Sequence, residues 1–177
     1  MGLDITWYRG LTESPNEPRE ECGEIVDYDN ATDFYIQAPW ADYAKEFKDD
    51  MAYRWEESDC FRAGSYGGYG QFRDILRGVG GFNALSWYAT PNGGQKTDDE
   101  RCSTLPFYHL VCFSDCEGTI GTSACAKLAK DFDDMREKFM GEIGSHDGTM
   151  RDYYEGKYNE WANACKQASD HGAIRFH

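Results

Sequence analysis

The sequence contains no long apolar run and no targeting segment. None of its apolar stretches approaches the roughly 20 residues that a membrane-spanning helix needs. The first residues, Met1 to Thr6, carry neither the basic start nor the apolar core of a signal peptide. We therefore expect a cytoplasmic protein without a membrane partner. The 7 cysteines are scattered and odd in number, so in that compartment we expect reduced thiols and no disulfide framework.

Basic residues are scarce, with 18 Lys and Arg against 32 Asp and Glu, and the net charge is −14. The imbalance lies in residues 1–60, where 16 acidic and 5 basic residues give −11. Residues 61–120 contribute −1 and residues 121–177 contribute −2. Contacts to nucleic-acid phosphates need Lys and Arg, so the sequence argues against DNA or RNA as a partner. An acidic surface can serve solubility alone, or it can bind a basic protein by imitating nucleic acid.

The 177 residues fit a single domain spanning 1–177 with one hydrophobic core. Hydrophobic residues make up only 40% of the chain, but 12 Tyr, 10 Phe and 5 Trp supply large buried areas. Alternating apolar and polar residues predict strands at 3–8, 33–37, 51–56 and 173–177. Apolar spacing of three and four residues predicts helices over 69–79, from 122 onward and over about 150–170.

The remaining segments are predicted to connect these elements. Residues 82–104 and 114–121 have turn and loop composition, and residues 12–30 fit either a loop or an extended hairpin arm. Residues 105–113 fit either a short helix or a buried strand. Gly80 and Gly81 are expected to end the first helix, and Gly172 to cap the last one. Because strands come first and no βαβ rhythm follows, we expect an α+β fold with an antiparallel sheet and about three helices on one face. The last strand is expected to pair with the first.

The glycine-rich stretch from Cys60 to Gly70 is the first candidate site. Its glycines allow sharp turns, and the helix that follows would point its N-terminal N–H groups at the loop. Guanidinium groups suit phosphate, tyrosine rings can stack on a base, and a serine adds a hydroxyl. The residues concerned are Arg62, Ser65, Tyr66, Tyr69 and Arg73. The spacing matches no phosphate-binding loop motif, and a plain turn with both tyrosines in the core is the alternative.

The second candidate is the loop around Cys116. Ser114, Asp115 and Glu117 could bind ribose or base edges, or Ser114 and Asp115 could make loop and cap hydrogen bonds. Cys116 could act as a nucleophile if His109 were its base. A zinc site using His109, Cys112 and Cys116 lacks a fourth ligand. We therefore expect neither a metal nor a cofactor.

Three segments, Met1 to Thr6, Phe61–Tyr69 and Phe113–Leu128, resemble a family of small proteins encoded by tailed phages and prophages. The resemblance implies a phage accessory protein that acts in the cytoplasm of the host bacterium. It implies no catalytic residue.

Two functions follow as hypotheses. The first is a homo-oligomer that binds and sequesters a nucleotide-type ligand, such as a host immune signal, without chemistry. The alternative is an acidic inhibitor with a nucleic-acid-like face that binds a host defence protein. A hydrolase that uses Cys116 is a weaker third hypothesis.

Overall fold

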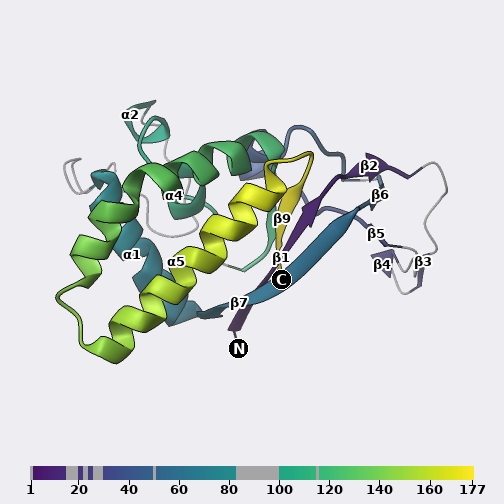
Figure 1. The fold of residues 1–177 in the computed structure, drawn as a ribbon. Helices are drawn as coiled ribbons and strands as arrows, with labels where there is room; N and C mark the ends of the chain where they lie inside the picture. The colour runs from purple at the N-terminus through teal and green to yellow at the C-terminus, as the bar shows by residue number, and fades with distance from the viewer. Residues whose placement is uncertain are drawn as a thin grey trace.

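The computed structural model describes residues 2–14, 20–21, 24–25, 30–49, 51–82, 100–114 and 116–177. A four-stranded antiparallel sheet in the order β7-β1-β9-β8 forms its centre. Three long helices pack on one face of this sheet (Figure 1). The expected α+β fold with an antiparallel sheet is confirmed. In the described part of the chain, no helix is both long and apolar enough to cross a bilayer.

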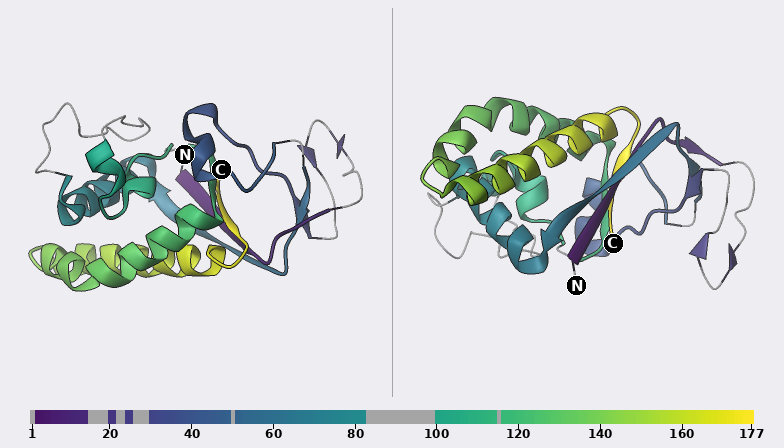
Figure 2. Two further views of the ribbon diagram at one scale, coloured as in Figure 1. Left: turned by 90° about the horizontal axis from the view of Figure 1, so that it is seen from above. Right: turned by 60° about the horizontal axis from the view of Figure 1, so that its bottom comes forward.

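The first and last strands of the chain lie side by side in the middle of this sheet. The strands are β1 (Gly2–Arg9), β7 (Glu57–Ser65), β8 (Gly118–Gly121) and β9 (Ala173–Phe176). Thr6 of β1 lies opposite Cys60 of β7 and Arg175 of β9. The expected pairing of the terminal strands is therefore confirmed, and both termini lie close together in Figure 2.

Sequence signals explain the ends of the helices. The helices are η1 (Ala38–Tyr43), α1 (Tyr66–Gly80), α2 (Glu100–Ser103), α3 (Tyr108–Val111), α4 (Thr122–Ile143) and α5 (Gly148–Ala168). Ser65 accepts a hydrogen bond from the Gly68 amide at 3.1 Å and so caps α1. Asp147 caps α5 in the same way, through the Met150 amide at 3.0 Å. Gly81 ends α1 with φ 87°, as expected.

The N-terminal third adds short strands outside the main sheet. They are β2 (Thr12–Glu13), β3 (Glu20–Glu21), β4 (Glu24–Ile25), β5 (Ala31–Thr32) and β6 (Tyr53–Arg54). β6 pairs with both β2 and β5, and β3 pairs with β4. The expected strand at 51–56 is thus reduced to β6.

Two expectations about strands and loops are wrong. Residues 33–37 form no strand, because their backbone groups bond to side chains and not to a neighbouring strand. The Thr119 hydroxyl donates to the Tyr35 carbonyl at 3.0 Å, and the Ile36 amide donates to the Asp49 carboxylate at 2.7 Å. Residues 114–121 are not wholly a loop, since their second half is β8, which pairs with β9. In 105–113, α3 covers only four residues. Most of the expected loops at 12–30 and 82–104 lie outside the described residues.

β1 buries side chains on both of its faces. Leu3, Ile5 and Trp7 point into the large core beneath the helices. Tyr8 points to the opposite face, where Phe34 and Tyr53 cover it. Consecutive side chains of a strand alternate between faces, so one strand anchors both cores. Phe34 and the apolar residues from Phe47 to Trp55 are therefore held against the second face, whereas Trp40 and Tyr43 of η1 pack into the large core.

Gly172 has a different role from the one expected. The last helix ends at Ala168 with Ser169 as its cap, and Gly172 does not have a positive φ. A Cβ at position 172 would lie 2.1 Å from the Tyr8 carbonyl oxygen and 2.8 Å from the Ala168 Cα. Glycine is thus required because the backbone atoms of β1 and of the end of α5 come so close to this position, just before β9, that no side chain fits.

We expect Gly172→Ala to lower the free energy of unfolding by about 3 kcal/mol, since backbone atoms cannot move aside as a flexible side chain can. The matched control is Gly156→Ala, because nothing lies within 4 Å of a Cβ in that α5 position. The control should raise stability by roughly 0.5–1 kcal/mol through helix propensity. Urea unfolding measures both values. A Gly172→Ala variant as stable as the wild type would contradict the close packing described here.

Candidate functional site

The glycine-rich turn leaves part of its candidate residues on the surface. Arg62 is exposed and lies 3.6 Å from Asp4, and Tyr66 is 40% exposed. Ser65 uses its hydroxyl to cap α1. Ser65 and Tyr66 lie at the start of α1, where unpaired N–H groups favour an anion, whereas Arg62 lies earlier in β7 and faces Asp4 of β1.

The other two candidate residues of this stretch are core residues. Tyr69 is 0% exposed, its ring stacks on Trp161 with 5.7 Å between centroids, and the Arg73 guanidinium lies 4.5 Å from the ring centroid. Arg73 also donates to the Phe113 carbonyl at 2.9 Å. No face of Tyr69 is open to a stacking base. For Tyr69 the alternative interpretation, a packed ring behind a turn, describes the structure, whereas Tyr66 stays outside.

In the Ser114–Glu117 loop, the Ser114 hydroxyl is engaged in hydrogen bonds to the turn that follows it. Ser114 is buried, and its Oγ accepts from the amides of Cys116 and Glu117, both at 3.4 Å. Glu117 is exposed, and Asp115 lies outside the described residues.

The loop precedes β8 whereas Ser65 ends β7, so the two candidate segments lie at opposite edges of the sheet. Three strand spacings separate these edges, about 14 Å. Arg73 links α1 to the start of the second segment through Phe113.

The thiol of Cys116 is exposed, and its Sγ lies 3.4 Å from the Ser114 Oγ. The expected base, His109, packs edge-on against Tyr43 with 4.7 Å between ring centroids. Burial raises the pKa of the Cys112 thiol above its ordinary range, so this neighbouring cysteine stays protonated. Within the described ranges, no group of three or more His, Cys, Asp and Glu side chains could hold a metal ion.

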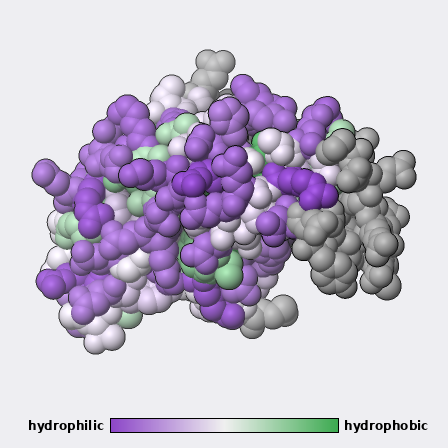
Figure 3. Space-filling model, turned by 45° about the vertical axis from the view of Figure 1, so that its right-hand side comes forward, coloured by the Kyte–Doolittle hydropathy of each residue, from purple (hydrophilic) through white to green (hydrophobic). Residues whose placement is uncertain are grey.

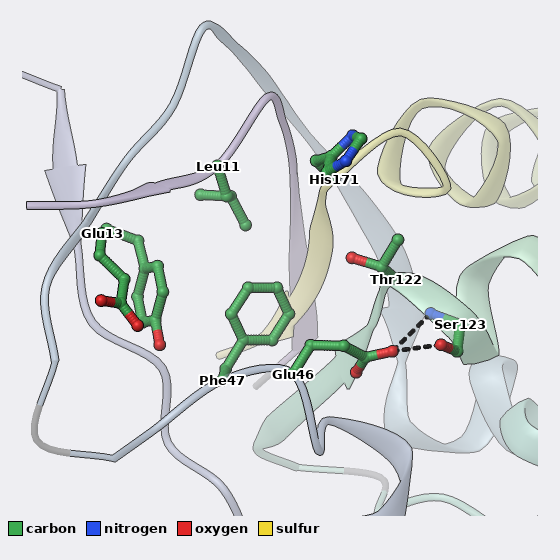
Figure 4. A pocket seen from close by; sticks show the side chains of 8 residues that line it. Leu11, Glu13, Glu46, Phe47, Thr122, Ser123 and His171 are labelled. Atoms are coloured by element: carbon green, nitrogen blue, oxygen red, sulfur yellow. Dashed lines mark hydrogen bonds between the residues drawn. The ribbon is translucent and has the colours of Figure 1, made fainter.

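A pocket of about 310 Å³ lies elsewhere, between the N-terminal third and the start of α4 (Figure 4). We call it the Glu46 pocket. Its lining comes from the β1–β2 connection, β2, the segment after η1, β6, the first turn of α4 and the turn before β9. The lining residues are Leu11, Glu13, Glu46, Phe47, Tyr53, Thr122, Ser123 and His171. Its size is at the lower end of the range for small-molecule sites.

Glu46 joins the N-terminal third to α4. Its Oε1 accepts hydrogen bonds from the Ser123 amide at 3.0 Å and from the Ser123 hydroxyl (Figure 4). A Cβ on Gly121 would lie 2.7 Å from the Glu46 Oε2, so the glycine before the helix lets the carboxylate approach. A negative charge is favoured at the positive end of a helix dipole. The 22-residue α4 therefore holds this carboxylate in place.

Opposing effects act on the pKa of Glu46. Burial is the largest, and it raises the pKa; the hydrogen bonds from the Ser123 hydroxyl, the Glu46 amide and the Ser123 amide lower it, as does the nearby Lys45. Together they hold the pKa of Glu46 below its usual value. The carboxylate is therefore charged at neutral pH.

The other groups of the pocket combine an apolar floor with polar walls. Leu11, Phe47 and Tyr53 belong to the second core and form the floor. Glu13 pairs with Lys48 at 2.9 Å, and the Tyr53 hydroxyl accepts from the Lys48 amide at 3.0 Å. None of the described lining residues is Lys or Arg. The lining thus favours a cation with an apolar stem over a phosphate.

No pattern in the sequence singles out these pocket residues. Glu46 lies among other charged residues, Ser123 follows the residue at which a helix is predicted to begin, and His171 has no other histidine or cysteine near it in the chain. A helix start favours a nearby carboxylate in general, because its first N–H groups have no partner within the helix. Nothing local indicates that the carboxylate comes from 77 residues earlier in the chain.

Comparison of the chain with models of known protein families, with curated proteins and with solved structures finds no match.

Proposed function

We propose that this protein binds a basic protein partner through its acidic N-terminal third and carries out no chemistry of its own. The observation that supports this best is the Glu46 pocket, which offers two carboxylates and an apolar floor. Five of its eight lining residues belong to residues 1–60, which carry most of the negative charge. Charge and shape therefore point to the same part of the molecule.

The carboxylates of the N-terminal third face solvent. Eight of them are exposed among the described residues up to position 60, against two exposed lysines, Lys45 and Lys48. The exposed acids are Asp4, Glu13, Asp42, Glu46, Asp49, Glu56, Glu57 and Asp59. An excess of one charge sign on a surface steers a partner of the opposite sign and sets its approach.

The surface turned forward in Figure 3 is mostly hydrophilic, with small and separate apolar patches. An interface formed there would depend on charged and polar contacts more than on a large apolar area. The resemblance to phage proteins makes a basic host defence protein the expected partner, inside the host bacterium.

A labelled oligolysine peptide tests this proposal with a defined basic probe. We expect wild-type binding to weaken steeply as salt rises from about 50 to about 300 mM, because the charges are exposed. The test variant carries Asp42→Asn, Glu46→Gln, Asp49→Asn and Glu56→Gln, which change the net charge from −14 to −10. Its Kd, measured by fluorescence anisotropy, should rise by about tenfold.

The control variant removes the same number of charges from exposed positions of α4 and α5. It carries Asp133→Asn, Glu137→Gln, Glu142→Gln and Asp152→Asn. Its Kd should change by no more than about twofold. Equal losses in both variants would mean that only net charge matters, and they would overturn the proposal.

Sequestration of a nucleotide-type ligand by a homo-oligomer is the second candidate. The observation in its favour is that Ser65 and Tyr66 are exposed at the start of α1 and that Arg62 is exposed earlier in β7. The Lys157 ammonium donates to the Arg62 carbonyl at 2.6 Å and pairs with Glu160 at 2.7 Å, so it adds a cation whose charge is balanced in part. Any such site uses Arg62, Ser65 and Tyr66 without the buried Tyr69 ring.

A thermal-shift screen against nucleotides and cyclic nucleotides tests this second candidate. A true ligand at 100 times its Kd adds about 2.7 kcal/mol to the free energy of unfolding. Arg62→Ala and Tyr66→Ala should abolish the shift, whereas Glu46→Gln should preserve it. A flat screen would exclude the candidate.

A further inference from the structure

We propose that the Glu46 pocket receives a single lysine side chain of the partner. This inference rests on the proposed function, since it specifies which group of a basic protein the acidic region recognises. It assigns a binding role to Glu46, Glu13 and Tyr53 that the surface charge alone does not require.

The floor of the pocket suits the stem of a lysine. Leu11, Phe47 and Tyr53 offer aliphatic and aromatic surface that is continuous with the second core. A lysine side chain buries its methylene groups along such a surface while its ammonium stays at polar groups. A cavity of about 310 Å³ accommodates one such side chain without rearrangement of the chain.

The polar groups suit the ammonium. Glu46 and Glu13 supply negative charge from two sides of the pocket (Figure 4). The Tyr53 hydroxyl already accepts from the Lys48 amide, and its oxygen keeps a second lone pair for another donor. Glu13 binds the Lys48 ammonium through Oε1 at 2.9 Å, so a lysine of the partner meets this carboxylate at its second oxygen.

The same geometry favours lysine over arginine. Arginine binds a carboxylate most strongly through two parallel hydrogen bonds, one to each oxygen. Both donors of Ser123 converge on Oε1 of Glu46, so this oxygen is occupied. An ammonium needs one oxygen at a time and can turn among several acceptors. The pocket therefore discriminates by geometry as well as by charge.

The test is an NMR titration with N-acetyl-lysine methylamide, with the norleucine and arginine analogues as matched probes. The reporter is the Ser123 amide, because it donates to Glu46. The lysine probe should shift this signal to saturation. The arginine probe should bind about fivefold more weakly, and the norleucine probe, which keeps the stem without the charge, should leave the signal unchanged.

Two variants separate binding from folding. Glu46→Gln keeps the shape of the side chain and should weaken the lysine probe by about tenfold. Glu13→Gln changes an exposed side chain, and it should weaken the binding of the probe as well. Glu137→Gln, on the exposed side of α4, is the control and should bind as the wild type does.

The possible negative results of this titration have different consequences for the two proposals. If the lysine probe does not shift Ser123 while oligolysine still binds through the acidic third, the pocket inference is wrong and the proposed function stands. If oligolysine also fails to bind, both are wrong. Equal shifts from the norleucine probe would show an apolar pocket without charge recognition, which overturns the inference.

Discussion

The structure depends on burying one strand from both sides. In β1, Trp7 points into the core under the helices, and the next residue, Tyr8, points into the core on the opposite face. Neighbouring side chains of a strand point to opposite faces, so Trp7 and Tyr8 anchor the two cores at adjacent positions of one strand. β7 and β9 pair with the two edges of this strand and bring α1 and α5 with them.

The pocket is a consequence of that constraint. Because Tyr8 must be covered, the chain around Phe34 and Tyr53 folds against the second face of the sheet. The segment after η1 then passes the start of α4, where Glu46 finds the Ser123 donors. An acidic stretch that would otherwise be only a solvated surface thus gains one carboxylate in a fixed position. The apolar floor beside it comes from the same covering layer.

Local patterns in the sequence predicted much of the fold. The stripe of apolar residues placed α4 at Thr122, Gly81 marked the end of α1, and the alternation in 173–177 indicated β9. β8 was missed because Gly118–Gly121 is short and glycine-rich, and only its pairing with β9 makes it a strand. Tyr66 and Tyr69 could not be told apart, since both fit one helix face; the first lies at the helix start and stays outside.

The candidate site was harder to predict for the same physical reason. Glu46 and Ser123 lie 77 positions apart and meet only in the fold, so the sequence around each residue contains no pattern that indicates their contact. The sequence identified the acidic third as a possible binding region, but it did not show which carboxylate is held in place. It also could not show that the glycine-rich turn and the Ser114–Glu117 loop end at opposite edges of the sheet.

The central claim is that Glu46 is a charged group held by the start of α4. The most direct measurement compares the free energy of unfolding of the wild type and Glu46→Gln from pH 7 to acid. Since the folded-state pKa of Glu46 is lowered, its charge stabilises the fold above the usual carboxyl pKa, and this advantage is lost as the pH falls through the folded-state value. We predict that the variant is about 0.5 kcal/mol less stable at pH 7 and that the gap closes in acid. A gap that stays constant with pH, or that opens in acid, would contradict the claim.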